Sequence, residues 1–177
     1  MTTLQDFRDE FQRYRLIGER AMAQVSDDAL NRRVTPGINS IAMLVRHVSG
    51  NLRSRFTDFL KSDGEKPWRN RDAEFEERDY ARAEMGASWV EGWKILEEQL
   101  MGLTEADLQA TVRIRNQPLT VHEALCRSLA HIAYHVGQIT LLSRILSEGE
   151  WRWLSVPKGK SGEYNQNPTL EKRPGGA

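Results

Sequence analysis

The strongest constraint on the fold is the helical periodicity of residues 120–146. Apolar side chains recur there in steps of three and four, at Leu125, Leu129, Ile132, Val136 and Ile139. This spacing places them on one face of an α-helix, whereas a strand would need strict alternation. The pair Thr120 and Glu123 is typical of a capping box at a helix start. The segment therefore predicts a long amphipathic helix that ends near Leu146.

Three more segments show the same periodicity, and together the four predict an all-α four-helix bundle. Their apolar faces run over residues 4–25, from about Ile41 to Lys61, and over residues 86–103. Thr2 or Thr3 can cap the first of these helices, because a short side-chain oxygen accepts from free backbone N–H groups.

The connections divide the chain into a bundle and a tail. Residues 62–78 are dense in charge and contain a glycine and a proline, which predicts a long, solvated crossover loop between the second and third helices. Residues 111–118 favour a small strand or hairpin. We expect residues 1–150 to form the bundle, and residues 151–177 to form a polar tail that packs on the bundle or on a dimer.

Charge and cysteine content exclude several classes of function. Twenty-five basic residues balance twenty-five acidic ones, and no one-sided Lys/Arg cluster stands out along the chain. We therefore expect neither a nucleic-acid partner nor a membrane partner. The first residues lack the basic and apolar regions of a signal peptide. The single cysteine excludes an internal disulfide, so we expect a cytoplasmic protein.

Three histidines form the candidate functional site. His131 and His135 lie one helical turn apart on the last helix, and His47 lies toward the inner face of the second helix. Imidazoles from two helices can converge in a bundle core, where bundles commonly build metal sites. Three nitrogen ligands suit zinc, nickel or iron(II) and leave a position for water or substrate.

The histidine spacing alone leaves an alternative open. A pair of histidines four apart is a weak motif, and His47 could be a hydrogen-bonded core residue. His122 should point away from the other three because it lies about half a turn from His131, so we expect it to be exposed. Cys126 is expected to be a core thiol. Ile132 stands where a zinc-protease motif needs its glutamate, which argues against that mechanism.

Several motifs resemble the DinB/YfiT-like superfamily of metalloenzymes. They are His47-Val48-Ser49-Gly50-Asn51 and the later His131-x-x-x-His135, followed by Gly137-Gln138. The stretches Asp63-Gly64-Glu65-Lys66-Pro67-Trp68 and Val156-Pro157-Lys158-Gly159-Lys160-Ser161 are similar to one bacterial branch of it.

The resemblance implies a four-helix bundle with a long crossover, a homodimer, and a divalent metal on His47, His131 and His135. It also implies small-molecule chemistry, because relatives include transferases and isomerases that use thiols such as bacillithiol, mycothiol or glutathione. We therefore expect a metal-dependent enzyme such as a low-molecular-weight-thiol S-transferase. A metal-dependent hydrolase and a non-enzymatic, dimeric metal-binding stress-response protein are the alternatives.

Neighbouring side chains bear on this choice of chemistry. No carboxylate lies in register with His131 and His135, and hydrolysis usually needs such a base, which favours a metal-bound thiol. Asn51 and Gln138 could hydrogen-bond the ligands, or could be polar residues at a helix–helix seam.

Overall fold

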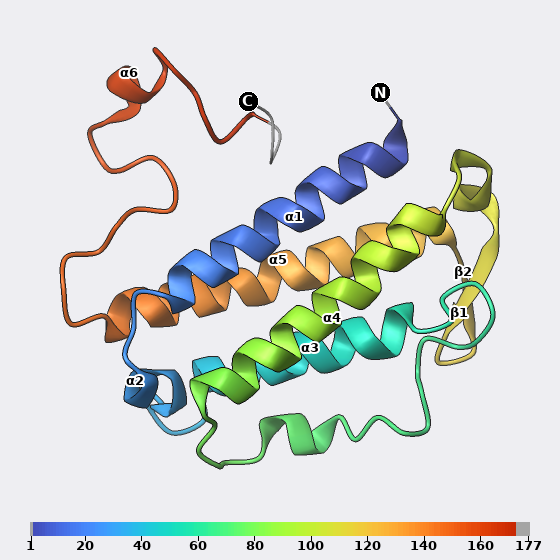
Figure 1. Cartoon of the computed structure of the whole chain (residues 1–177), viewed down its shortest axis with the longest axis horizontal. Helices are drawn as coiled ribbons and strands as arrows, with labels where there is room; N and C mark the ends of the chain where they lie inside the picture. Colours follow the sequence, from blue (N-terminus) through green and yellow to red (C-terminus); the bar gives the residue numbers. More distant parts are fainter. Residues whose placement is uncertain (1, 173–177) are drawn as a thin grey trace.

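Four long helices form the body of the molecule (Figure 1). A computed structural model describes residues 2–172. The long helices are α1 (Thr3–Met22), α3 (Ile41–Phe56), α4 (Arg82–Gly102) and α5 (Val121–Leu146). The prediction of a mainly helical chain is confirmed, since the described residues contain only one two-stranded sheet.

The core lies between these four helices. Helix α3 packs along α4 and α1 packs along α5, with further contacts between α3 and α5 and between α1 and α4. The largest fully buried side chains include Phe11, Phe56, Trp89, Trp93 and Leu125. Trp89 and Trp93 contact each other with ring centroids 5.4 Å apart. Burial of large apolar side chains is the main source of stability in such a core.

The connection from α3 to α4 runs back along the length of the molecule. Helices α3 and α4 point in the same direction, while α1 and α5 point in the opposite direction (Figure 1). Residues 57–81 span this return and include the short 3₁₀ helix η1 (Asp72–Phe75), which packs against α3. The connection therefore passes beside the helix that carries His47.

The short elements follow local sequence signals. Ser26 caps α2 (Asp27–Asn31) by accepting from the backbone N–H of Ala29. After η2 (Glu105–Gln109), strands β1 (Thr111–Ile114) and β2 (Gln117–Thr120) form an antiparallel hairpin. Its turn places Arg115 and Asn116 at φ angles of 53° and 62°. The capping box predicted at the start of α5 is confirmed in its backbone and side-chain hydrogen bonds.

Helix α3 ends earlier than the sequence predicts. The periodicity placed its end near Lys61, but the helix stops at Phe56. Asp58 adopts a left-handed φ of 50°, and its carbonyl accepts from the backbone N–H groups of Lys61 and Ser62. Phe59 is buried all the same, against the ring of Phe56. The turn keeps Phe59 buried outside the helix, so the apolar spacing in the sequence continues beyond the point where the helix ends.

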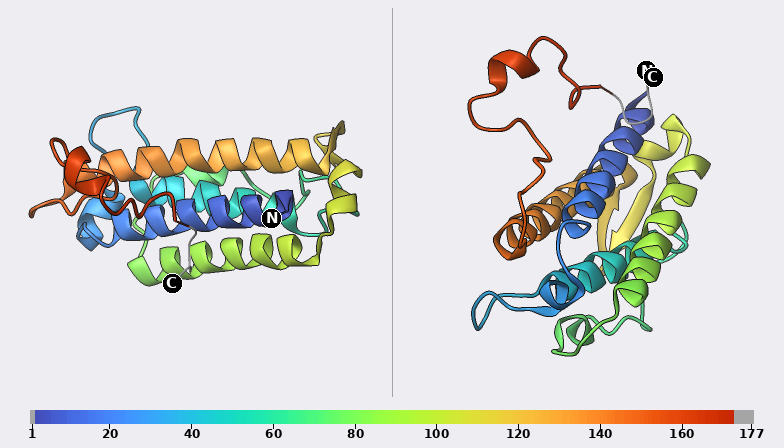
Figure 2. Two further views of the ribbon diagram at one scale, coloured as in Figure 1. Left: turned by 90° about the horizontal axis from the view of Figure 1, so that it is seen from above. Right: turned by 60° about the vertical axis from the view of Figure 1, so that its left-hand side comes forward.

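The tail after α5 contacts α1. The backbone N–H of Arg152 donates to Gln24, and Trp151 and Leu154 pack against the core. The tail then passes through α6 (Ser161–Tyr164) and returns beside α1, where Arg13 donates to the carbonyl of Leu170 (Figure 2). The last five residues of the predicted tail, 173–177, lie outside the described residues. Within residues 2–172, every helix falls short of the length or apolar character that crossing a bilayer requires.

Candidate metal centre

Three histidines from two helices meet beside the crossover. One possible ligand atom from each of His47, His131 and His135 lies within 4.8 Å of the others. The imidazole centroids are 4.5 to 5.1 Å apart. His47 is 4% exposed and His135 is 9% exposed. The structure thus brings together the three residues that the sequence singled out, in a group that could hold a metal ion.

Hydrogen bonds orient two of the three rings. Nδ1 of His47 lies 2.8 Å from Oε2 of Glu74, and a carboxylate only accepts, so this nitrogen carries the proton. Nδ1 of His135 likewise lies 2.8 Å from Oε1 of Gln138, as expected for a residue that orients a ligand. Both contacts leave Nε2 free to bind a metal. Asn51 lies in the wall of the same cavity.

The distance between the rings fits a common metal. Nε2 of His47 lies 3.1 Å from Nε2 of His131. Two nitrogens bound to one tetrahedral zinc at about 2.0–2.1 Å lie roughly 3.3 Å apart, so this spacing needs only a small adjustment. The other ring nitrogen of His131, Nδ1, is buried and has no hydrogen-bond partner among the described residues.

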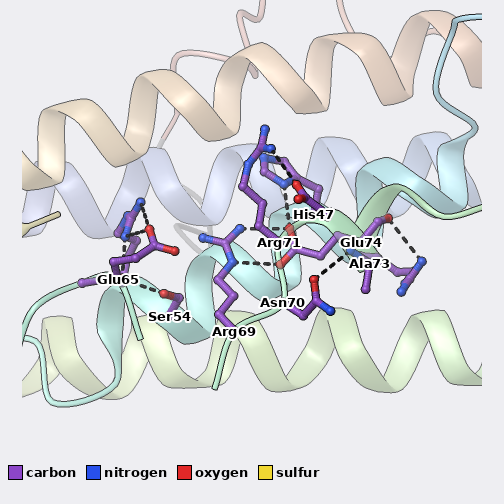
Figure 3. Close-up of polar contacts among 12 residues, drawn as sticks. His47, Ser54, Glu65, Arg69, Asn70, Arg71, Ala73 and Glu74 are labelled. Atoms are coloured by element: carbon purple, nitrogen blue, oxygen red, sulfur yellow. Dashed lines mark hydrogen bonds and ion pairs between the residues drawn. The ribbon is translucent and has the colours of Figure 1, made fainter. Parts of the chain in front are cut away.

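Glu74 is the residue that sequence reasoning missed. Its carboxylate lies between His47 and Arg69, whose guanidinium donates to both of its oxygens at 2.8 and 3.0 Å (Figure 3). The crossover was predicted to be solvated, which is wrong here: Glu74 and Lys66 are each only 7% exposed. The loop must pass along α3 to reach the start of α4, and this brings η1 against the helix.

Gly50 makes room for this carboxylate. A Cβ atom at position 50 would lie 2.2 Å from Oε1 of Glu74 and 2.9 Å from its Cδ, so the carboxylate or the helix would have to shift. The glycine follows His47 by three residues, so it lies on the same side of α3. The glycine three residues after His47 is the sequence signal that could have indicated a group packed against the helix.

Burial and charge set the protonation of the site. Burial, together with the nearby cationic groups, lowers the pKa of His131 to about 3. Burial also lowers the pKa of His135, with a contribution from Arg71. For Glu74, burial would raise the pKa, but the hydrogen bonds from His47 and Arg69 outweigh it and lower the pKa. Neutral His131 and His135 beside an ionised carboxylate are in the protonation states that metal binding requires.

The segment Asp63-Gly64-Glu65-Lys66-Pro67-Trp68 joins the crossover to the hairpin. The Asp63 carboxylate accepts from the backbone N–H groups of Glu65, Arg115 and Asn116 at 2.7 to 2.8 Å. Gly64 also donates to the carbonyl of Arg113. These contacts hold the hairpin turn against the loop that carries Arg69 and Glu74. The motif therefore has a structural role at the edge of the site.

A cavity of about 820 Å³ opens beside the histidines. Its walls come from α3, the crossover, the hairpin and α5. The lining residues are Asn39, His47, Asn51, Arg55, Arg69, Arg71, Phe75, Ile114, Arg115, Arg127, Ser128, Ala130, His131, Tyr134, His135 and Gln138. No Asp or Glu within residues 2–172 is among them. A cavity of this size accommodates a small-molecule substrate.

Two other residues on α5 complete the comparison with the sequence. His122 is exposed and lies against the ring of Phe7, outside the cluster, as predicted. The prediction that Cys126 is a core thiol is wrong, because Cys126 is exposed and its Sγ lies 3.9 Å from His122. The buried face of α5 is occupied at this level by Val121 and Leu125 instead.

A comparison with protein families assigns the chain to one of them. A family model described as a protein of unknown function (DUF1572) matches residues 1–160. The chain belongs to this family. No curated protein matches the chain.

The fold of the chain is similar to that of a solved structure. The crystal structure of a DinB-like protein from Bacillus cereus ATCC 10987 matches with a TM-score of 0.58 and 18% sequence identity. The match covers 82% of this chain and 95% of that chain. This DUF1572 chain therefore shares the fold of a DinB-like protein, in agreement with the resemblance of its motifs.

Proposed function

We propose that the protein binds one divalent metal ion through His47, His131 and His135, within the four-helix bundle of a DinB-like metalloenzyme. The observation that carries this proposal is the convergence of three imidazoles at the wall of a cavity. His131 adds support, since no hydrogen bond to Nδ1 orients its ring and a metal bound at Nε2 would hold it in place.

The donor set indicates the kind of metal. Three imidazole nitrogens suit zinc or nickel, and also iron(II), better than calcium or magnesium, which prefer oxygen. Three protein ligands leave a coordination position open toward the cavity, which is typical of reactive sites. The ligands are neutral, so the bound ion keeps its full charge and favours an anionic fourth ligand.

The surrounding residues favour thiol chemistry over hydrolysis. A metal bound here could generate a hydroxide from water or hold a substrate thiol as its thiolate. Glu74 is committed to His47 and Arg69, and no described carboxylate lines the cavity to act as a base. A thiolate needs no such base once it is formed. We therefore propose a metal-dependent enzyme that activates a low-molecular-weight thiol for transfer to an electrophile.

Cobalt substitution tests this chemistry directly. The cobalt-loaded protein is titrated with glutathione, bacillithiol or mycothiol, and the near-ultraviolet spectrum is recorded. We expect a thiolate-to-cobalt charge-transfer band that is absent from the His131→Ala variant and unchanged in His122→Ala. Turnover of ester or amide substrates without any thiol band would support a hydrolase instead. Metal binding with neither signal would support a non-enzymatic metal-binding protein.

We also propose a homodimer, formed through the outer face of α5. The apolar residues of α1 and α4 are largely buried in the core. A group of exposed apolar residues lies elsewhere, on α5 and in the connection before α3. Val34, Ile38, Leu141 and Ile145 line one apolar pocket there and are 42 to 60% exposed. Such a patch is typical of an interaction surface.

Charge substitution on this patch tests the dimer. We expect light scattering to report a dimer for the native chain and a monomer for Leu141→Glu. Met101→Glu is the matched control, because Met101 is 68% exposed on α4, away from the patch. A native monomer at micromolar concentration would contradict the proposal.

A further inference from the structure

We propose that the substrate of this site carries an oxyanion, a carboxylate or a phosphate group, which arginine side chains bind beside the metal. The inference rests on the proposed function, because the three histidines define where the reacting end of the substrate lies. It adds the chemical class of the remainder of the substrate.

The cavity gathers arginines from distant parts of the chain. Arginine is the only residue type in its lining that carries a permanent charge, and the five are Arg55, Arg69, Arg71, Arg115 and Arg127. They come from α3, the crossover, the hairpin turn and α5. The whole chain has a formal net charge of zero. The cationic cavity is therefore a local feature, and the expectation of no Lys/Arg cluster is corrected by the fold.

Three of these arginines are held by carboxylates outside the lining. Arg69 donates to both oxygens of Glu74, as described above. Arg55 and Arg115 share Glu65, whose Oε2 lies 3.3 and 3.0 Å from their nitrogens. These ion pairs fix the cavity wall, and they use part of the hydrogen-bonding capacity of the three guanidinium groups.

The other two arginines are available to a ligand. Arg71 has only a loose contact with Asp72 at 3.7 Å, and its guanidinium lies over the ring of Phe75. Arg127 makes no ion pair or hydrogen bond to any residue from 2 to 172, although it lines the cavity. A guanidinium presents several donors in a fixed plane that matches the two oxygens of a carboxylate or phosphate.

The position of Arg127 connects it to the metal ligands. Arg127, His131 and His135 follow one another at intervals of four residues on α5, so their side chains share one face of the helix. A substrate whose oxyanion binds Arg127 would extend along this face toward the histidines. Phe75, Tyr134 and Ile114 supply apolar surface in the wall of the same cavity.

The electrostatics favour an anionic occupant over a neutral one. A bound divalent ion would add positive charge to a cavity that already holds five guanidinium groups and no described carboxylate in its lining. An oxyanion would relieve the repulsion among these groups and would also be steered toward them over longer distances. A cationic substrate would meet like charge on every charged wall.

Titration calorimetry on the zinc-loaded, full-length protein tests the inference. The probes are succinate, inorganic phosphate and 1,4-butanediol, a neutral molecule of the same chain length as succinate. We expect saturable binding of at least one oxyanion and no binding of the diol. Arg71→Gln and Arg127→Gln should each raise the Kd roughly tenfold, the loss typical of one charge-assisted contact. Tighter binding of phosphate or of succinate assigns the group.

Arg20→Gln is the matched control. Arg20 is an exposed residue of α1 that does not line this cavity, so its replacement should leave the Kd unchanged. Three results would overturn the inference: binding of the diol as tight as that of the oxyanions, no saturable oxyanion binding, or a Kd that is unchanged in both the Arg71→Gln and the Arg127→Gln variants. Repeating the titration after a chelator has removed the metal tests oxyanion binding separately from metal binding. If the protein binds no metal but still binds the oxyanion through the arginines, the proposed function is contradicted and this inference is not.

Discussion

The Glu74 carboxylate lies 2.8 Å from Nδ1 of His47, across 27 residues of sequence. It is joined on its other side by Arg69, which is 3% exposed. A carboxylate that accepts from a histidine ligand fixes the tautomer of the ring and makes its other nitrogen a better metal ligand. Glu74 therefore connects the crossover to the metal centre.

Replacing Glu74 with glutamine should weaken metal binding without abolishing the fold. Loss of such a ligand-orienting group typically costs about 10- to 100-fold in metal affinity. Competition with a fluorescent zinc chelator measures the change. Glu76→Gln is the control, because Glu76 is exposed and lies just beyond η1. Equal affinities for the two variants would remove Glu74 from the account.

Gly50→Ala should disturb the same contact from the opposite side. The added methyl group would collide with the Glu74 carboxylate, so either η1 or the carboxylate must move. We expect metal affinity to fall and the variant to unfold at a lower temperature. Gly86→Ala in α4 meets open space and should be neutral or stabilising, since alanine favours helix more than glycine does. If Gly50→Ala and Gly86→Ala have the same metal affinity and unfolding temperature, the packing of Glu74 against α3 does not determine either property.

The metal-free protein should lose stability as the pH falls below about 6.5. His131 remains neutral in the folded state down to about pH 3, whereas in the unfolded chain it takes up a proton near pH 6.5. The unfolded state therefore binds more protons across this window, and its relative stability rises as the pH drops. Urea unfolding of chelator-treated protein between pH 7 and pH 4 measures the slope. His131→Gln should show a shallower slope over the same range, and an identical slope would contradict this explanation.

Asp63→Ala should destabilise the protein by about 1–2 kcal/mol, because it removes a carboxylate that accepts three backbone hydrogen bonds. Denaturant unfolding measures this loss. Asp79→Ala, an exposed substitution in the same connection, should change stability little. We also expect Asp63→Ala to broaden the amide signals of residues 113–116, because the hairpin turn loses its attachment. Unchanged signals would indicate that the turn is fixed by its own strands.

The sequence predicted the helices, the hairpin and the three histidines because each depends on local periodicity or spacing. His131 and His135 are on one helix, so their register follows from the sequence alone, and the inner face of α3 placed His47. The end of α3 could not be predicted, since a turn at Asp58 keeps Phe59 buried outside the helix.

The residues around the histidines were hidden from the sequence for a different reason. Glu74, Arg69 and Arg71 lie in a charged connection that resembles any solvated loop. Only the path of that loop along α3 brings them to the site. Arg127 was overlooked because one arginine on a polar helix face has no meaning until the other cavity walls are placed.

Metal content by plasma mass spectrometry tests the central claim most directly. The native protein should carry close to one zinc, nickel or iron ion per chain. His47→Ala, His131→Ala and His135→Ala should each lose that ion while remaining helical by circular dichroism, because deleting one of three ligands weakens a metal site severely. His122→Ala, the one other histidine of the chain, should retain the metal in full. Retention after two of the three ligand substitutions, or equal loss in His122→Ala, would contradict the account.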